Sequence, residues 1–168
     1  MSEIKLLNIV GARPQIIKSS AINRAIRANF PDRIKEYTLH TGQHYDPKLS
    51  ATFFEELGIP APHINLEVGS GTQAEQTAGI MLGFEKELFA HPSDLVIVVG
   101  DVTSTMACSI TAKKLNTKVA HIEAGIRSFD LTMPEEINRM VTDSITDLFF
   151  TTSHFANENL RKAGVPED

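Results

Sequence analysis

The segment of residues 119–139 holds the side chains best suited to acid–base chemistry. A short apolar run is followed by the carboxylate of Glu123, by Ala124-Gly125 and by the cation of Arg127. In open α/β sheets, the residues that follow a buried strand face the crevice beyond the carboxyl ends of the strands. This pattern indicates one wall of an enzyme site for an anionic substrate, although Glu123 could instead pair with Arg127 as part of the structure.

A predicted helix that begins near Pro134 adds three more charges, those of Glu135, Glu136 and Arg139. Glu135 follows Thr132 at the spacing of a capping box, in which the acid returns to the backbone of the threonine. Glu135 and Glu136 also precede Arg139 at helical spacing, so either acid could pair with it on one helix face. The residues alone leave a structural and a catalytic role for this helix start equally open.

Two earlier turns carry further candidates. Asp101 follows an apolar run at residues 94–99 and could act in catalysis or cap the next helix. Arg13 lies in the turn Gly11-Ala12-Arg13-Pro14, where a phosphate would meet both its guanidinium and a helix N-terminus. Lys18 follows on the second turn of that helix, where it could also be ordinary solvated surface.

The histidines and the single cysteine suggest fewer functions. Gln43 and His44 end a predicted strand, where ligand contact and a structural role are both open, whereas His121 lies inside a strand and is expected to be a hydrogen-bonded core residue. None of the six histidines is spaced for metal binding on one element, so no metal is expected. Cys108 is expected to be a small core residue, and a lone cysteine allows no intramolecular disulfide, which fits a reducing compartment.

Predicted strands and helices alternate along the whole chain, which favours parallel strands joined by right-handed crossovers. The strands are expected at 4–10, 35–41, 63–66, 94–99, 118–122 and 148–151, and the helices at 14–28, 47–57, 73–90, 103–115, 134–146 and 154–164. With the strand order 3-2-1-4-5-6, the first and fourth strands meet at the switch point and the fifth lies beside the fourth. Arg13, Asp101 and Glu123 would then converge at one edge.

Length and composition exclude several classes of protein. The 168 residues suit one α/β domain, a Rossmann-like doubly wound parallel sheet spanning 1–168. A net charge of -5 argues against nucleic-acid binding, and no apolar run is long enough to span a membrane. The amino terminus has the pattern of a first strand and lacks that of a signal peptide, so a cytoplasmic location is expected. The chain has no G-x-G-x-x-G spacing, so we expect no nicotinamide or flavin cofactor, and it has no Walker A loop.

Five motifs together resemble the non-hydrolysing UDP-N-acetylglucosamine 2-epimerases. They are Gly11-Ala12-Arg13-Pro14, Thr41-Gly42-Gln43-His44, Gly100-Asp101-Val102-Thr103-Ser104-Thr105, His121-Ile122-Glu123-Ala124-Gly125-Ile126-Arg127 and Pro134-Glu135-Glu136-Ile137-Asn138-Arg139. The resemblance covers essentially the whole chain. It implies the N-terminal half of a glycosyltransferase-B-type fold, in which two Rossmann-like domains face each other across a cleft.

The resemblance also implies a reaction, conversion of UDP-GlcNAc to UDP-ManNAc. UDP leaves C1 as the C2 proton is removed, a glycal forms, and UDP and a proton are added back with inversion at C2. No cofactor is implied. The matching positions imply that Asp101, Glu123 and Glu135 are catalytic. The residues implied to bind the substrate or organise its site are Arg13, Lys18, Gln43, His44, Glu136 and Arg139. The implied partners are a UDP-sugar, the C-terminal domain and a second copy in a homodimer, and the isolated domain is expected to be inactive.

Some positions depart from the pattern of many bacterial members of this family. Gln15 stands where those members have Glu, and Val68-Gly69-Ser70-Gly71 replaces an Arg-Gln pair of an allosteric site, so such regulation is not expected. The run from Arg127 to Asp130 is more similar to relatives that act on modified UDP-sugars such as diacetamido-uronic acids. The alternatives are therefore an epimerase that acts on such a modified UDP-sugar, a hydrolysing epimerase, and a non-catalytic domain that binds an anion or a partner.

Overall fold

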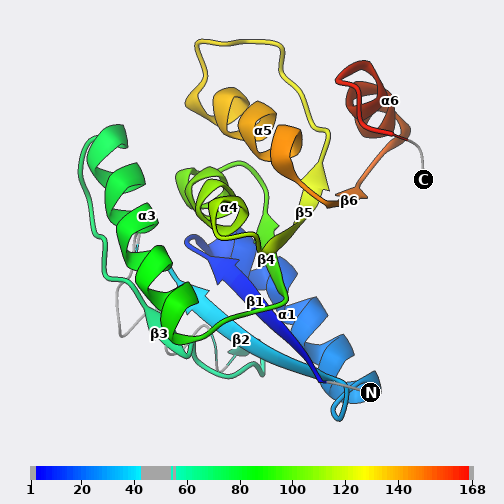
Figure 1. The fold of residues 1–168 in the computed structure, drawn as a ribbon. Helices are drawn as coiled ribbons and strands as arrows, with labels where there is room; N and C mark the ends of the chain where they lie inside the picture. The colour runs from blue at the N-terminus through cyan, green and yellow to red at the C-terminus, as the bar shows by residue number, and fades with distance from the viewer. Residues whose placement is uncertain (1–2, 43–53, 55, 167–168) are drawn as a thin grey trace.

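The computed structural model describes residues 3–42, 54 and 56–166, which form a doubly wound α/β domain. Its six strands are all parallel and lie in the order β3-β2-β1-β4-β5-β6, which confirms the expected order (Figure 1). The strands are β1 (Ile4–Val10), β2 (Ile34–His40), β3 (Ile64–Asn65), β4 (Leu95–Val99), β5 (Lys118–Ala124) and β6 (Leu148–Thr151).

Helices connect these strands and cover both faces of the sheet. They are α1 (Arg13–Asn29), α3 (Gln73–Ala90), α4 (Thr103–Lys114), α5 (Pro134–Ile145) and α6 (His154–Lys162). The helix expected at 47–57 lies largely outside the described residues. Two boundaries differ from expectation in a way that affects the site: Arg13 is the first residue of α1 and not part of the preceding turn, and β5 continues past Ile122 to include Glu123.

The core has a layer on each face of the sheet. Helices α3, α4 and α5 lie along one face and α1 lies along the other (Figure 1). The layer under α3 and α4 contains Leu7, Ile9, Leu39, Ile80, Phe84, Leu88, Val96, Val98, Ala107, Cys108, Ala112 and Val119. The layer under α1 contains Leu6, Ile26, Ile97, Val99 and Ala120. Cys108 is fully buried, as expected of a small core residue.

The carboxyl end of β5 departs from regular strand geometry. Val119 packs in the layer under α4 and Ala120 in the layer under α1, as the alternation of a strand requires. Regular alternation would place Glu123 on the same face as His121. Instead the pairing with β6 shifts register between Ile122 and Ala124, and Glu123 adopts a φ of 70°. The bend turns its carboxylate towards Lys18 on α1.

None of the helices in the described part of the chain is long and apolar enough to cross a membrane.

Candidate active site

The carboxyl ends of β4 and β5 bring Asp101 and Glu123 to the same edge of the sheet. A Cβ added to Gly100 would lie 3.5 Å from a carboxylate oxygen of Glu123, and Asp101 is the next residue. His121 Nε2 lies 2.8 Å from the carbonyl oxygen of Gly100. The convergence that the strand order predicts for these two acids is therefore present.

Asp101 is held by helix α5. Its Oδ2 accepts hydrogen bonds from Arg139 Nε at 3.0 Å and from Arg139 Nη2 at 2.5 Å, and its backbone oxygen accepts one from Asn138 Nδ2 at 2.8 Å. The residue that precedes α4 is Val102, and no side chain caps that helix. Asp101 is therefore not the helix cap that its position allowed, and its carboxylate lies against a cation that is 13% exposed.

Glu123 pairs with a cation from the opposite side of the sheet. Lys18 Nζ lies 2.6 Å from Glu123 Oε1, and the two side chains are 39% and 24% exposed. The alternative partner Arg127 is bound instead to Asp143, at 2.6 Å. Lys18 is thus more than solvated surface, because it reaches a candidate catalytic carboxylate.

The two acids at the start of α5 have different surroundings. Glu135 is exposed. The alternative capping box is absent, since Met133 precedes the helix without a side-chain cap and the Thr132 hydroxyl donates to Asp130 Oδ1 at 2.7 Å. Glu136 is 1% exposed and lies beneath the loop that precedes the helix.

Glu136 binds that loop to Arg139. Its oxygens accept from the backbone nitrogens of Ser128 and Phe129, at 3.0 and 3.1 Å, from the Ser128 hydroxyl at 3.1 Å, and from Arg139 Nη1 at 2.9 Å. Burial alone would raise the pKa of Glu136, but these donors lower it to about 2. The carboxylate sits inside the structure and organises the guanidinium that contacts Asp101.

Arg13 is the first residue of α1 and is exposed at the carboxyl end of β1, so the structure places it at the same edge as Asp101 and Glu123. Gln43 and His44 lie outside the described residues.

Gln15 is a residue of this edge whose role the sequence did not reveal. Its Oε1 accepts from the backbone nitrogens of Gly11 and Ala12, at 2.7 and 3.1 Å, and its Nε2 donates to the carbonyl oxygen of Val99 at 2.7 Å and to Thr105 Oγ1 at 3.3 Å. The amide thereby joins the carboxyl ends of β1 and β4. An ionised glutamate could not donate to Val99, so the amide is required for this arrangement. The signal available in the sequence was an amide residue three positions after the cap of a helix.

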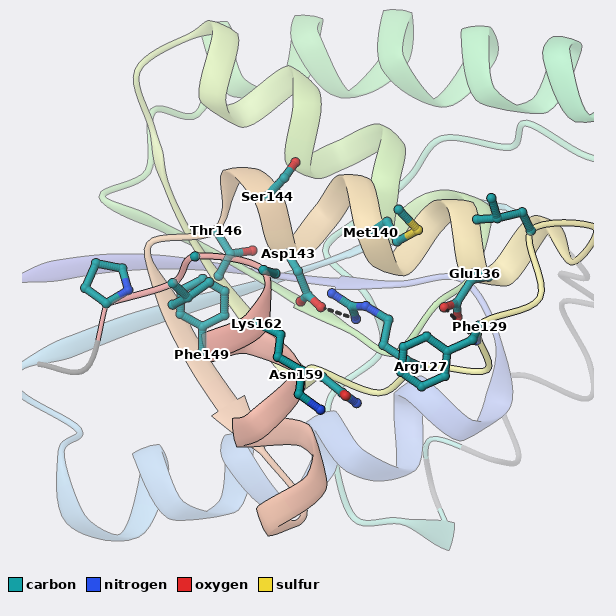
Figure 2. Close-up of a pocket in the computed structure, with 15 residues that line it drawn as sticks. Arg127, Phe129, Glu136, Met140, Asp143, Ser144, Thr146, Phe149, Asn159 and Lys162 are labelled. Atoms are coloured by element: carbon teal, nitrogen blue, oxygen red, sulfur yellow. Dashed lines mark hydrogen bonds and ion pairs between the residues drawn. The ribbon is translucent and has the colours of Figure 1, made fainter.

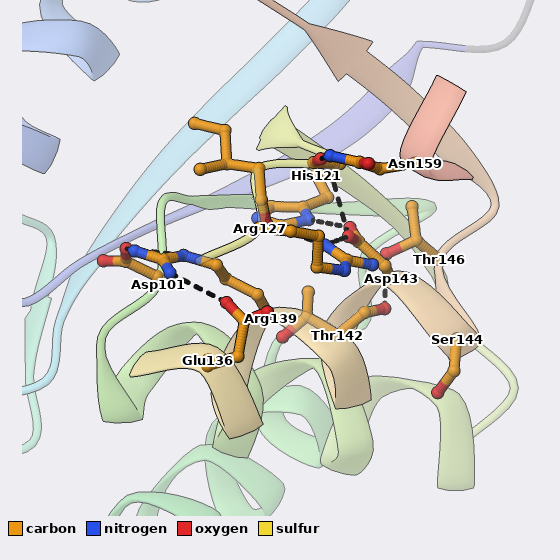
Figure 3. Close-up of polar contacts among 12 residues, drawn as sticks. Asp101, His121, Arg127, Glu136, Arg139, Thr142, Asp143, Ser144, Thr146 and Asn159 are labelled. Carbon is orange, nitrogen blue, oxygen red and sulfur yellow. Dashed lines mark hydrogen bonds and ion pairs between the residues drawn. The ribbon is translucent and has the colours of Figure 1, made fainter. Parts of the chain in front are cut away.

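A buried cluster of His121, Asp143 and Arg127 lies under the same edge, and Asp143 was not identified from the sequence (Figure 3). Asp143 Oδ1 lies 2.7 Å from His121 Nδ1, and Asp143 Oδ2 accepts from Arg127 Nη1 at 2.6 Å and from the backbone nitrogen of Gly125 at 3.1 Å. Burial alone would raise the pKa of Asp143, but its bonds to His121 and Arg127 lower it. His121 is a hydrogen-bonded core residue, as expected.

A hollow of about 740 Å³ lies between α5, α6 and the loop before α5 (Figure 2). Glu136 and Asp143 line it, but the bonds described above already occupy their oxygens. Asp101, Glu123 and Glu135 do not line it. This cavity is therefore separate from the three candidate catalytic acids. Among the residues that the structure describes, no group of three or more His, Cys, Asp or Glu side chains could hold a metal ion.

Comparison with known proteins identifies the family. The sequence profile of the UDP-N-acetylglucosamine 2-epimerases matches residues 27–168. The chain is 46% identical to a UDP-N-acetylglucosamine 2-epimerase homolog of Methanococcus maripaludis, over 96% of this chain and 44% of that protein. It is 42% identical to UDP-2,3-diacetamido-2,3-dideoxy-D-glucuronate 2-epimerase of Pseudomonas aeruginosa, over 96% of this chain and 45% of that protein.

A solved structure shows the same likeness. The UDP-GlcNAc 2-epimerase of Methanocaldococcus jannaschii, crystallised with UDP-GlcNAc and UDP, matches with a TM-score of 0.91 at 44% identity, over 97% of this chain and 44% of that one. The chain thus spans less than half the length of each of these relatives. The fold, the order of the motifs and these matches lead to one conclusion: the chain belongs to the UDP-N-acetylglucosamine 2-epimerase family.

Proposed function

We propose that this chain is the N-terminal domain of a two-domain enzyme that interconverts UDP-GlcNAc and UDP-ManNAc. The observation that carries the proposal is that Asp101 and Glu123 lie at one edge of the sheet. Each acid is paired with a cation from another element. The similarity to an epimerase crystallised with UDP-GlcNAc and UDP supports this choice of substrate. The relatives are more than twice as long as the matched region, which supports a second domain that completes the cleft.

The proposed reaction needs groups that take and return a proton at C2. In the first half, a carboxylate removes the C2 proton, the electrons of that bond form the C1–C2 double bond, and UDP leaves with the electrons of the C1–O bond. In the second half, a UDP oxygen rebinds C1 and a proton is delivered to the opposite face of C2. Asp101, Glu123 and Glu135 are the proposed acids and bases, because they lie at this edge or on the helix that adjoins it.

The cations have the complementary task of holding the diphosphate as negative charge develops on it. Arg13 and Lys18 both belong to the first turns of α1, which follows the carboxyl end of β1. Gln43 and His44 remain proposed substrate contacts. A homodimer and a cytoplasmic location are also proposed, the latter because Cys108 is a free thiol.

A second candidate substrate is a diacetamido-uronic acid linked to UDP. The observation in its favour is the similarity to the Pseudomonas aeruginosa enzyme named for such a sugar. Assays with both UDP-sugars separate the two candidates, because turnover of the uronic acid alone would reject UDP-GlcNAc as the substrate.

The direct test is Asp101→Asn in the two-domain enzyme, measured as interconversion of UDP-GlcNAc and UDP-ManNAc. Losing one acid–base group should lower kcat about 10²–10⁴-fold while the fold persists. The matched control is Asp94→Asn, because Asp94 lies at the amino end of β4 and accepts from the backbone nitrogen of Lys5. Near-normal turnover by the Asp101 variant would remove Asp101 from the mechanism. We also expect the 168-residue chain to be inactive alone, and conversion by it would contradict the need for a second domain.

A further inference from the structure

The backbone at the two catalytic turns needs support, because regular strand pairing ends there. Gly100 has a φ of 69° and Glu123 a φ of 70°, and the ladder between β5 and β6 is irregular at Glu123. A carboxylate that transfers a proton must nevertheless be positioned closely, since a displacement of about 1 Å can cost about 10²-fold in rate. The bond from the Gly100 nitrogen to the Ile122 carbonyl oxygen, at 2.9 Å, is the last backbone link between β4 and β5, so contacts outside the ladder must hold the residues beyond it.

His121 makes that connection directly. The residue lies on β5, two positions before Glu123, and its Nε2 lies 2.8 Å from the carbonyl oxygen of Gly100, the residue before Asp101. Its ring is fully buried, so no water competes for these contacts. The contact joins β5 to Gly100, the first residue after β4.

The other side of the ring is held by Asp143. Nδ1 lies 2.7 Å from Asp143 Oδ1. The second oxygen of Asp143 accepts from the backbone nitrogen of Gly125, which is two positions after Glu123. Arg127 also donates to Asp143, so the carboxylate is charged and carries no hydrogen of its own. The Gly100 carbonyl oxygen can only accept, so Nε2 donates to it, and the ring has a fixed partner at each of its nitrogens.

We propose that His121 is a positioning residue for the epimerisation site, holding the turn of Asp101 and the turn of Glu123 at a fixed separation. This inference rests on the proposed function, because it assigns those turns to catalysis. The ring is fully buried and is therefore not exposed at the edge of the sheet. It acts through the Gly100 carbonyl on one side and through Asp143 and the Gly125 nitrogen on the other.

The kinetic test uses His121→Phe and His121→Gln in the two-domain enzyme. Phe keeps a ring but removes both ring nitrogens, and should lower kcat per folded enzyme about 10²-fold with little change in KM. Gln retains an amide donor and should recover part of that loss. The control is His63→Gln, because the ring of His63 also bonds a backbone group, the Thr38 nitrogen, at a distant edge of the sheet. Parental kcat in the folded Phe variant would overturn the proposal.

Two measurements on the 168-residue chain do not depend on turnover. Long-range ¹H–¹⁵N spectra should show hydrogen on Nε2 of His121, the nitrogen that faces the Gly100 carbonyl oxygen, and a bare Nε2 would overturn the proposal. In His121→Phe, amide hydrogen exchange should accelerate at Gly125 but not at Val119, whose nitrogen donates to Asp147. Equal protection of Gly125 in both proteins would also overturn it. If the parental two-domain enzyme has no epimerase activity, the proposed function fails, while these measurements still decide whether His121 holds the turns.

Discussion

Asp143 and Asp147 hold opposite ends of the same strand with similar chemistry. Asp143 accepts from the backbone nitrogen of Gly125 and from Arg127 at the carboxyl end of β5. Asp147 accepts from the backbone nitrogen of Val119, at 2.7 Å, and from Lys113 at the amino end. The pairs differ in burial: the side chains of Asp143 and Arg127 are 2% and 8% exposed, and those of Asp147 and Lys113 are 30% and 33% exposed.

The difference shows which end of β5 is held in position by buried contacts. At the amino end, a partly exposed ion pair is enough, because β5 there continues in a regular ladder with β4. At the carboxyl end, the backbone leaves the ladder, and a buried carboxylate joins His121, Arg127 and the Gly125 nitrogen. The edge that bears the candidate acids is therefore held by charges that are costly to bury and costly to leave unpaired.

The largest change in stability is expected from Asp143→Asn. Removing this carboxylate leaves Arg127 buried without its counter-charge and His121 without its hydrogen-bond partner, which should lower the free energy of unfolding by about 3–5 kcal/mol. Asp147→Asn is the matched control and should cost about 1 kcal/mol or less, because its ion pair is partly exposed. Urea denaturation of both variants measures the difference. Equal losses would show that burial does not separate the two ends of β5.

A smaller, pH-dependent change is expected from Glu136→Gln. Hydrogen bonds lower the pKa of Glu136 to about 2 in the folded chain, against a usual value of 4.5. Because the folded pKa lies below the unfolded one, the carboxylate stabilises the fold fully above about pH 4.5 and loses this effect as the pH falls towards 2. This shift in pKa corresponds to about 3 kcal/mol in the free energy of unfolding.

Unfolding free energies of the parent and of Glu136→Gln across this range measure the effect. The gap between them should be widest at neutral pH and should narrow between about 4.5 and about 2. Glu135→Gln is the control from the adjacent position, and because Glu135 is exposed its stability should stay within about 0.5 kcal/mol of the parent. A gap at Glu136 that stays constant down to acidic pH would show that its bonds to the loop and to Arg139 contribute little.

The sequence was sufficient to predict the strand order and to predict that Asp101 and Glu123 lie at the same edge of the sheet. Alternating apolar runs and helical patterns specify a doubly wound sheet, and its topology places the carboxyl ends of β4 and β5 together. The N-cap of α3 was also predictable, because Thr72 and Glu75 stand at the spacing of a capping box, which forms. Such features depend on spacing along one segment or on rules that hold for a whole class of fold.

The partners of individual side chains were not predictable in the same way. Thr132 and Glu135 have the capping-box spacing too, yet Thr132 bonds Asp130 instead. Glu123 pairs with Lys18 and not with nearby Arg127, because the backbone bend turns it to the other face of the sheet. These outcomes depend on tertiary geometry and on competition for buried cations, which local spacing does not encode.

The smallest change in stability is expected at two residues in the left-handed region of backbone conformation. These residues also give the sharpest test of the comparison between the two ends of β5. At the amino edge this residue is Asn116, with a φ of 58° just after α4, where asparagine is well tolerated. At the carboxyl edge it is Glu123, with a φ of 70°, a conformation that costs a non-glycine residue about 1–3 kcal/mol.

Glu123→Gly relieves this backbone strain but also loses the ion pair with Lys18 and gives the unfolded chain more freedom, so stability should change by no more than about 1 kcal/mol in either direction. Turnover of the two-domain enzyme should nevertheless fall by about 10²–10⁴-fold, because the carboxylate is gone. Asn116→Gly should change stability by a few tenths of a kcal/mol and leave turnover intact. Thermal unfolding and the epimerase assay, run on both variants, separate these effects. If the Glu123 variant loses several kcal/mol, the bend at β5 serves the stability of the fold; if it keeps its stability and loses turnover, the strained backbone is retained because it aims a catalytic carboxylate at the edge of the sheet.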